Sequence, residues 1–156
     1  LLTDLIEPFI KSGIGMGTLK RAIDSTEDVH NPSVVKVVTD HLGNALYFSR
    51  APIPLVRDDA ARRTVEGLHY IHLGLYMYRR ETLLKLAAFP TGRLEEAEKL
   101  EQLRALEHGI PIRVWETEHA SLRVDTPEDV ELAAEKLQQC EVIKQELGTL
   151  KAAPSR

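Results

Sequence analysis

The chain has 156 residues, of which 43% are hydrophobic, and this is enough apolar surface for one domain with a core. Lys and Arg number 20 against 24 Asp and Glu, and no basic block stands out, so the charge pattern argues against a nucleic-acid-binding protein. The sequence has no run near the roughly 18 apolar residues of a membrane span and no basic start of a signal peptide, and its single cysteine cannot form an internal disulfide. We therefore expect a cytoplasmic protein with one α/β domain over residues 1–150 and a flexible tail over residues 151–156.

The first segment of the chain predicts a helix followed by a glycine-rich turn. Apolar residues recur at helical spacing through residues 1–12, although Pro8 among them indicates a kink or two short pieces. Gly13, Gly15 and Gly17 then alternate, which is a pattern that phosphate-binding loops also use. Because no Gly-Lys-Ser/Thr follows and no strand precedes, we interpret this stretch as a flexible turn.

Residues 34–38 and 45–49 predict the two strands of an antiparallel hairpin. The first run is rich in β-branched valine, and a turn of Asp, His, Leu and Gly separates it from the second. Residues 51–66 contain prolines and several charges without a clear period, so we expect a long exposed loop there. Loops of this length often serve as lids or binding loops.

Residues 68–78 predict the most informative strand. Its alternation places five mostly polar or small side chains on one face: Tyr70, His72, Gly74, Tyr76 and Tyr78. This face would suit a polar, hydroxyl-rich ligand, with the glycine leaving room for it to approach. The same face could instead pack under a helix with its hydroxyls bonded to backbone, and the sequence leaves both interpretations open.

Two helices are predicted next in the chain. Residues 81–88 form a short one, and residues 94–109 have the spacing of a single strong helix ended by a glycine. Four apolar side chains of the longer helix are expected to point inward: Ala97, Leu100, Leu103 and Leu106. Glu98, Glu101 and Gln102 share another face at i, i+3 and i+4 spacing, which is typical of a solvated surface.

A strand is predicted over residues 110–116, and a later strand end turns into a helix around Thr126 and Pro127. Threonine is a good N-cap and proline suits the first helical position, so the helix start is well marked. Asp125 precedes the cap at the carboxyl end of the strand, where open α/β sheets bind ligands. Its carboxylate is a candidate ligand for Mg²⁺, or it simply helps to cap the helix.

Five blocks of this sequence, in one order over residues 31 to 130, resemble the 3-deoxy-manno-octulosonate cytidylyltransferases, which are also called CMP-Kdo synthetases. The blocks are NPSVVKVV at 31–38, ALYFSRAPIP at 45–54, HLGLYMYR at 72–79, LEQLRALEHG at 100–109 and VDTPED at 124–129. The resemblance implies Mg²⁺-dependent transfer of CMP from CTP to the sugar acid Kdo, with release of pyrophosphate. It also implies a Rossmann-like nucleotidyltransferase fold whose mixed sheet includes an antiparallel hairpin, a homodimer, and a product used in lipopolysaccharide synthesis.

The resemblance also assigns roles to particular residues. Asp125 would be catalytic as one of two carboxylates that hold Mg²⁺. Five residues would bind the sugar acid or lie near it: Arg50, His72, Tyr76, Glu101 and Gln102. The resemblance thus implies that the polar strand face and the Glu/Gln helix face bind the same sugar acid.

Nothing in the sequence matches the family's amino-terminal phosphate-binding loop or the strand that ends in the second metal-binding Asp. We therefore expect the chain to be the carboxy-terminal portion of such an enzyme, without the nucleotide-binding half and inactive by itself. The alternative is a non-catalytic module that binds a sugar acid or forms a dimer.

Overall fold

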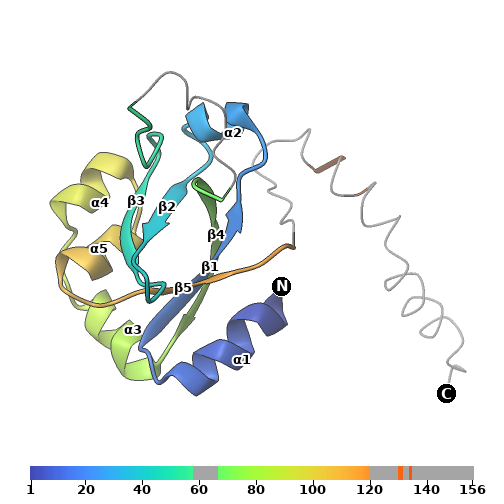
Figure 1. Cartoon of the computed structure of the whole chain (residues 1–156). Helices are drawn as coiled ribbons and strands as arrows, with labels where there is room; N and C mark the ends of the chain where they lie inside the picture. Colours follow the sequence, from blue (N-terminus) through green and yellow to red (C-terminus); the bar gives the residue numbers. More distant parts are fainter. Residues whose placement is uncertain (58–66, 120–129, 132–133, 135–156) are drawn as a thin grey trace, which may run out of the picture. The chain divides into compact units, whose positions relative to one another are not determined.

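The computed structural model describes residues 1–57, 67–119, 130–131 and 134 (Figure 1). The chain divides into two compact units, Leu1–His119 and Ala120–Arg156, and the first contains nearly all the described residues. In the second unit residues 130, 131 and 134 are helical, within the helix predicted there. Asp125 and the predicted tail lie outside the described residues, and the single domain over residues 1–150 stays a prediction.

The first unit is a five-stranded mixed sheet with helices on both faces (Figure 1). The strand order is β3-β2-β4-β1-β5, in which β1 and β5 are parallel and the other neighbours are antiparallel. The elements in chain order are α1 (Leu2–Ser12), β1 (Met16–Ala22), α2 (Thr26–His30), β2 (Lys36–Thr39), β3 (Ala45–Ser49), β4 (Tyr70–Tyr78), α3 (Arg80–Ala87), α4 (Arg93–Glu98), α5 (Gln102–Glu107) and β5 (Arg113–Glu116). The α/β class, the mixed sheet and the β2–β3 hairpin are confirmed.

Strand β1, for which the sequence predicts a turn and no strand, lies between β4 and β5 in the sheet. The predicted turn is confirmed only at Gly13, whose positive φ of 70° ends α1, because the strand already begins at Met16. Gly17 lies inside the strand, where a Cβ atom would stand 2.5 Å from the ring of Trp115 and 2.9 Å from that of Phe9. This glycine therefore allows close packing and does not make a turn.

Helix α1 runs continuously through Pro8, so the predicted division into two short pieces is wrong, whereas the predicted kink stays a prediction. Leu5 and Phe9 flank the proline and are both almost fully buried, and Leu5 packs with Leu19 of β1 and Leu73 of β4. The free energy gained by burying these two side chains exceeds the free energy lost with the one helical hydrogen bond that proline removes.

Strand β4 has the two faces that its alternation predicts. The odd-numbered residues from Ile71 to Met77 pack in the cluster beneath α1, whereas Tyr70, Tyr76 and Tyr78 pack in the larger cluster that contains residues of α5. A bulge interrupts the pairing of β4 with β1 but leaves the two faces separate. The aromatic face of β4 therefore looks toward α4 and α5.

The single helix predicted over residues 94–109 is wrong, because the structure has α4 and α5 with a break between them. Lys99 ends α4 with φ 55° and ψ 47°, in the left-handed region. Leu100 and Leu103 are buried and Leu106 is half-buried, but Ala97 is exposed and not inward as predicted. The break rotates α4 relative to α5, so the apolar spacing does not continue through both.

Candidate functional site

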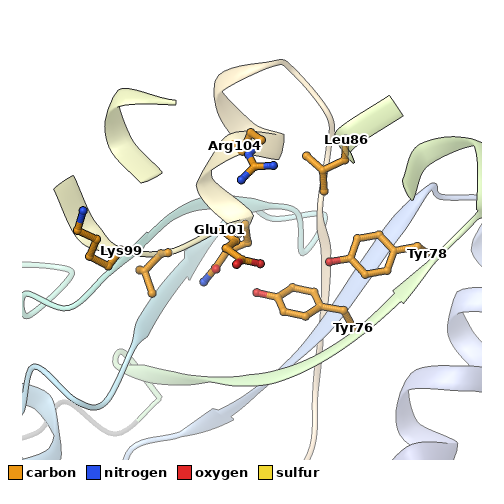
Figure 2. Close-up of a pocket in the computed structure, with 8 residues that line it drawn as sticks. Tyr76, Tyr78, Leu86, Lys99, Glu101 and Arg104 are labelled. Carbon is orange, nitrogen blue, oxygen red and sulfur yellow. The ribbon is translucent and has the colours of Figure 1, made fainter. Parts of the chain in front are cut away.

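A pocket of about 380 Å³ lies between the aromatic face of β4 and the turn that joins α4 to α5 (Figure 2). Pockets of a few hundred cubic ångströms are typical of small-molecule sites. The lining residues are Tyr76, Tyr78, Leu86, Lys99, Leu100, Glu101, Gln102 and Arg104. Two tyrosine hydroxyls, a carboxylate, an amide and two cations thus surround one cavity, with leucines between them.

The sheet side of the pocket is a row of aromatic rings. The ring centroids of His72 and Tyr76 are 5.3 Å apart, and those of Tyr76 and Tyr78 are 5.8 Å apart in a stacked arrangement. Figure 2 shows the hydroxyls of both tyrosines directed toward Glu101. Among the residues that the structure describes, the buried Tyr76 hydroxyl has no hydrogen-bond partner. A buried donor without a partner is uncommon in folded proteins, which makes this hydroxyl a candidate for binding a ligand.

Burial keeps the tyrosine hydroxyls of the pocket in their neutral form. It raises the pKa of Tyr76 far above its ordinary value of 10.0, and the charges of Tyr78 and Glu101 add to the shift. Burial also raises the pKa of Tyr78, with Glu101 again contributing. At neutral pH both phenols are therefore protonated and able to donate a hydrogen bond.

The helix side of the pocket is fixed by an ion pair across the break. Arg104 of α5 donates from Nε to one carboxylate oxygen of Glu95 in α4 at 2.7 Å, and its NH2 group donates to the other. These hydrogen bonds hold the pKa of the Glu95 carboxyl below its ordinary value. A bidentate pair of this kind sets orientation as well as distance, so α4 and α5 are tied at a fixed angle.

The structure places the predicted sugar-binding residues in three groups. Tyr76, Glu101 and Gln102 line the pocket together, with Glu101 exposed and Gln102 buried. His72 is buried beside Tyr76 and outside the lining. Arg50 also lies outside it, since its guanidinium donates to the backbone oxygens of Glu98 and Pro32. The binding roles of all five stay predictions.

Sequence reasoning did not select Lys99 or Arg104, the two cations of the pocket. Both lie in the stretch predicted as one helix, where their side chains would be ordinary solvated charges. Lys99 lines the pocket because it stands at the break between α4 and α5. Arg104 lines the pocket because its ion pair with Glu95 holds the side chain in place. One signal could have suggested Arg104: it follows Gln102 by two residues, within the block that resembles the cytidylyltransferases.

The predicted metal ligand, Asp125, lies outside the described residues. Within residues 1–57 and 67–119 and the three described positions beyond them, no group of three or more His, Cys, Asp or Glu side chains could hold a metal ion. Over the same part of the chain, the structure contains no helix with the length and apolar character to cross a membrane.

Comparisons with known proteins agree with the fold. A family model described as cytidylyltransferase matches residues 2–117. The 3-deoxy-manno-octulosonate cytidylyltransferase of Solibacter usitatus is 55% identical over 116 residues, which are 74% of this chain and 44% of that protein. The protein of the same name from Trichlorobacter lovleyi is 51% identical over 146 residues, which are 89% of this chain and 58% of that protein.

A solved structure of CMP:2-keto-3-deoxy-manno-octonic acid synthetase complexed with CTP superposes with a TM-score of 0.75 at 37% sequence identity. The match covers 85% of this chain and 52% of that one. The chain thus spans about half the length of the curated relatives that it matches. These shares do not confirm that it is the carboxy-terminal portion or that a nucleotide-binding half is missing.

Proposed function

Because this chain belongs to the cytidylyltransferase family, we propose that it forms part of an enzyme that transfers CMP from CTP to Kdo and releases pyrophosphate. The names of its relatives and the CTP bound in the similar solved structure support this proposal. Since the chain spans about half of those relatives, the activity is proposed for the whole protein that contains it.

The observation that carries the proposal is the composition of the pocket between β4 and the α4–α5 turn. The neutral Tyr76 hydroxyl can donate to a sugar oxygen, Glu101 can accept from a sugar hydroxyl, and the Gln102 amide can do both. Lys99 adds a cation that can pair with a carboxylate. A polyhydroxylated acid such as Kdo therefore matches the pocket, and we propose that it binds there with His72 supporting Tyr76.

In the proposed reaction the anomeric hydroxyl of Kdo attacks the α-phosphorus of CTP. A new bond forms between that oxygen and phosphorus, the bond from phosphorus to the bridging oxygen breaks, pyrophosphate leaves with the electrons of that bond, and the hydroxyl proton is released to solvent. The part assigned to this chain's pocket is to bind the sugar acid and orient its hydroxyl, which lowers the entropic cost of the reaction.

Mg²⁺ would neutralise the charge of the phosphates and orient them, with Asp125 as one of its ligands. We propose this metal role from the family resemblance, because the described residues do not test it. A homodimer, a cytoplasmic location and use of the product in lipopolysaccharide synthesis belong to the same proposal and have the same basis.

The test is pyrophosphate release by the complete natural protein from CTP, Kdo and Mg²⁺. We expect turnover by the wild type, near-complete loss in Asp125→Ala, and a higher KM for Kdo in Gln102→Ala. Glu96→Ala is the matched control, since Glu96 is exposed on α4 and outside the pocket lining. A complete protein that binds Kdo but does not turn over would instead favour the non-catalytic sugar-acid-binding module.

A further inference from the structure

Behind the pocket, one buried hydroxyl of β1 contacts the imidazole of β4. Thr18 is fully buried, and its Oγ1 lies 3.0 Å from Nε2 of His72. The same oxygen lies 3.1 Å from the backbone oxygen of Leu73 and 2.8 Å from that of Leu75. Three hydrogen-bonding groups therefore surround a single hydroxyl.

The bulge between β1 and β4 produces this arrangement. Thr18 pairs with Tyr76, but the next residue, Leu19, already pairs with Leu73, so two residues of β4 have no opposite partner in β1. The strand bends at this point, and both carbonyl oxygens lie within hydrogen-bonding distance of Thr18. Regular pairing would not bring two carbonyls of one strand to the same side chain.

Counting protons decides the direction of each hydrogen bond. A threonine hydroxyl has one proton to donate, whereas a carbonyl oxygen can only accept. If Thr18 donated to His72, both carbonyl oxygens would face hydroxyl lone pairs at 2.8 and 3.1 Å. The Thr18 proton therefore goes to a carbonyl, of which Leu75 is the nearer, and Nε2 of His72 must be the donor to Thr18.

We infer that Thr18 is a positioning residue that keeps a proton on Nε2 of His72 and fixes the plane of its ring. Two aromatic contacts hold the same ring, since Phe48 packs edge-on at 4.9 Å and Tyr76 lies at 5.3 Å between ring centroids. With its proton on Nε2, the neutral imidazole carries its lone pair on Nδ1. Thr18 thereby favours the Nε2-protonated tautomer of His72.

The consequence for substrate rests on the proposed function, in which His72 and Tyr76 bind the sugar acid. An imidazole that exchanges between tautomers would spend part of its time with the wrong donor, and its support of Tyr76 would weaken. Both effects lower affinity for the sugar acid without touching the reacting phosphorus. The loss of Thr18's hydroxyl should therefore raise KM and leave kcat nearly unchanged.

The tautomer can be measured directly, without any substrate. Long-range ¹H–¹⁵N spectra of the chain labelled at its six histidines distinguish protonated from unprotonated ring nitrogens, and His72→Gln identifies the signals of His72. We expect a protonated Nε2 in the wild type and in Thr18→Ser, which keeps the hydroxyl. Thr18→Val has the same shape without it and should shift His72 toward the other tautomer.

Two results would overturn the inference: an unprotonated Nε2 in the neutral wild-type His72, or unchanged His72 signals in Thr18→Val. If Thr18→Val fails to fold, the wild-type spectrum alone still decides the direction of the bond. Backbone ¹H–¹⁵N spectra of both variants establish whether they fold.

Kinetics of the complete natural protein test the link to substrate. In Thr18→Val we expect KM for Kdo to rise about fivefold to tenfold, as the loss of one orienting hydrogen bond implies, with kcat within about twofold of wild type. Thr18→Ser should stay near wild type. A changed tautomer with unchanged KM would overturn the link to substrate. A changed tautomer in a protein that never turns over Kdo would refute the proposed function and leave the role of Thr18 standing.

Discussion

Glu98 connects the end of β3 to the end of α4 through hydrogen bonds. It lies outside the pocket lining, and its removal should lower the stability of the fold. Its carboxylate accepts from the buried Ser49 hydroxyl at 2.6 Å and from the backbone N–H of Arg50 at 2.9 Å. Its own backbone oxygen accepts from the Arg50 guanidinium at 2.8 Å. Glu98→Ala deletes the two carboxylate bonds and leaves their donors without that acceptor.

The expected loss can be worked from these contacts. A hydrogen bond to a charged group contributes about 1.5–3 kcal/mol, and because Glu98 is half-buried the lower end applies, giving about 3 kcal/mol for the two. The buried ammonium of Lys36 adds to the effect, since burial lowers its pKa and the charge of Glu98 opposes that shift. At about 2–4 °C per kcal/mol for a chain of this size, the melting temperature should fall by about 6–12 °C.

Urea denaturation followed by far-ultraviolet circular dichroism and by the fluorescence of the single tryptophan measures this loss. Glu96→Ala is the matched control, because it removes an exposed glutamate from the same helix and should change the free energy of unfolding by less than about 0.5 kcal/mol. If both variants unfold at the same urea concentration, Glu98 does not hold β3 to α4, and its hydrogen bonds cannot offset the left-handed conformation of Lys99.

Two further predictions concern packing and pH. Gly17→Ala should lower the free energy of unfolding by about 2 kcal/mol, because its Cβ would lie 2.5 Å from the Trp115 ring. Gly74→Ala is the control, since its Cβ meets no atom within 4 Å, and it should lower the free energy of unfolding by less than about 0.5 kcal/mol. Equal losses in urea denaturation followed by circular dichroism would contradict the packing at Gly17. Burial raises the pKa of all four tyrosines, Tyr47, Tyr70, Tyr76 and Tyr78, so the folded state binds their protons more tightly than the unfolded state does. This stabilisation is complete below pH 10 and is lost as the pH rises above it. Tyrosinate absorbance should therefore appear near pH 10 in the urea-unfolded chain and only at higher pH in the folded chain. If the folded and unfolded chains titrate at the same pH, the tyrosines are not buried as the structure describes.

The elements that could be predicted are those whose own side chains decide their structure. The β-branched valines of the first hairpin strand and the period-2 alternation of β4 each predict a strand, and the structure has both. Strand β1 could not be predicted in this way. Two of its residues, Gly17 and Lys20, are poor strand formers, and their places depend on Trp115, Phe9 and Tyr70, which come from other elements.

The candidate site also combines residues that local sequence could predict with residues whose positions depend on other elements. His72 and Tyr76 share a face of β4 that the sequence alternation reveals, and the structure keeps them side by side. Glu101 and Gln102 were selected from a resemblance, and the structure adds the reason that they can face the tyrosines, which is the break before them. The bulge that turns two carbonyls toward Thr18 has no signal in the sequence of either strand, because it exists only in their pairing.

The break at Lys99 is what local sequence could least predict, since residues 94–107 are almost all good helix formers. In an unbroken helix Glu98, Glu101 and Gln102 would share one face. A left-handed lysine costs about 1–2 kcal/mol, which the two bonds to the Glu98 carboxylate are sufficient to offset. Tertiary bonds therefore outweigh helix propensity here, and the result is that Glu98 faces β3 while Glu101 and Gln102 line the pocket.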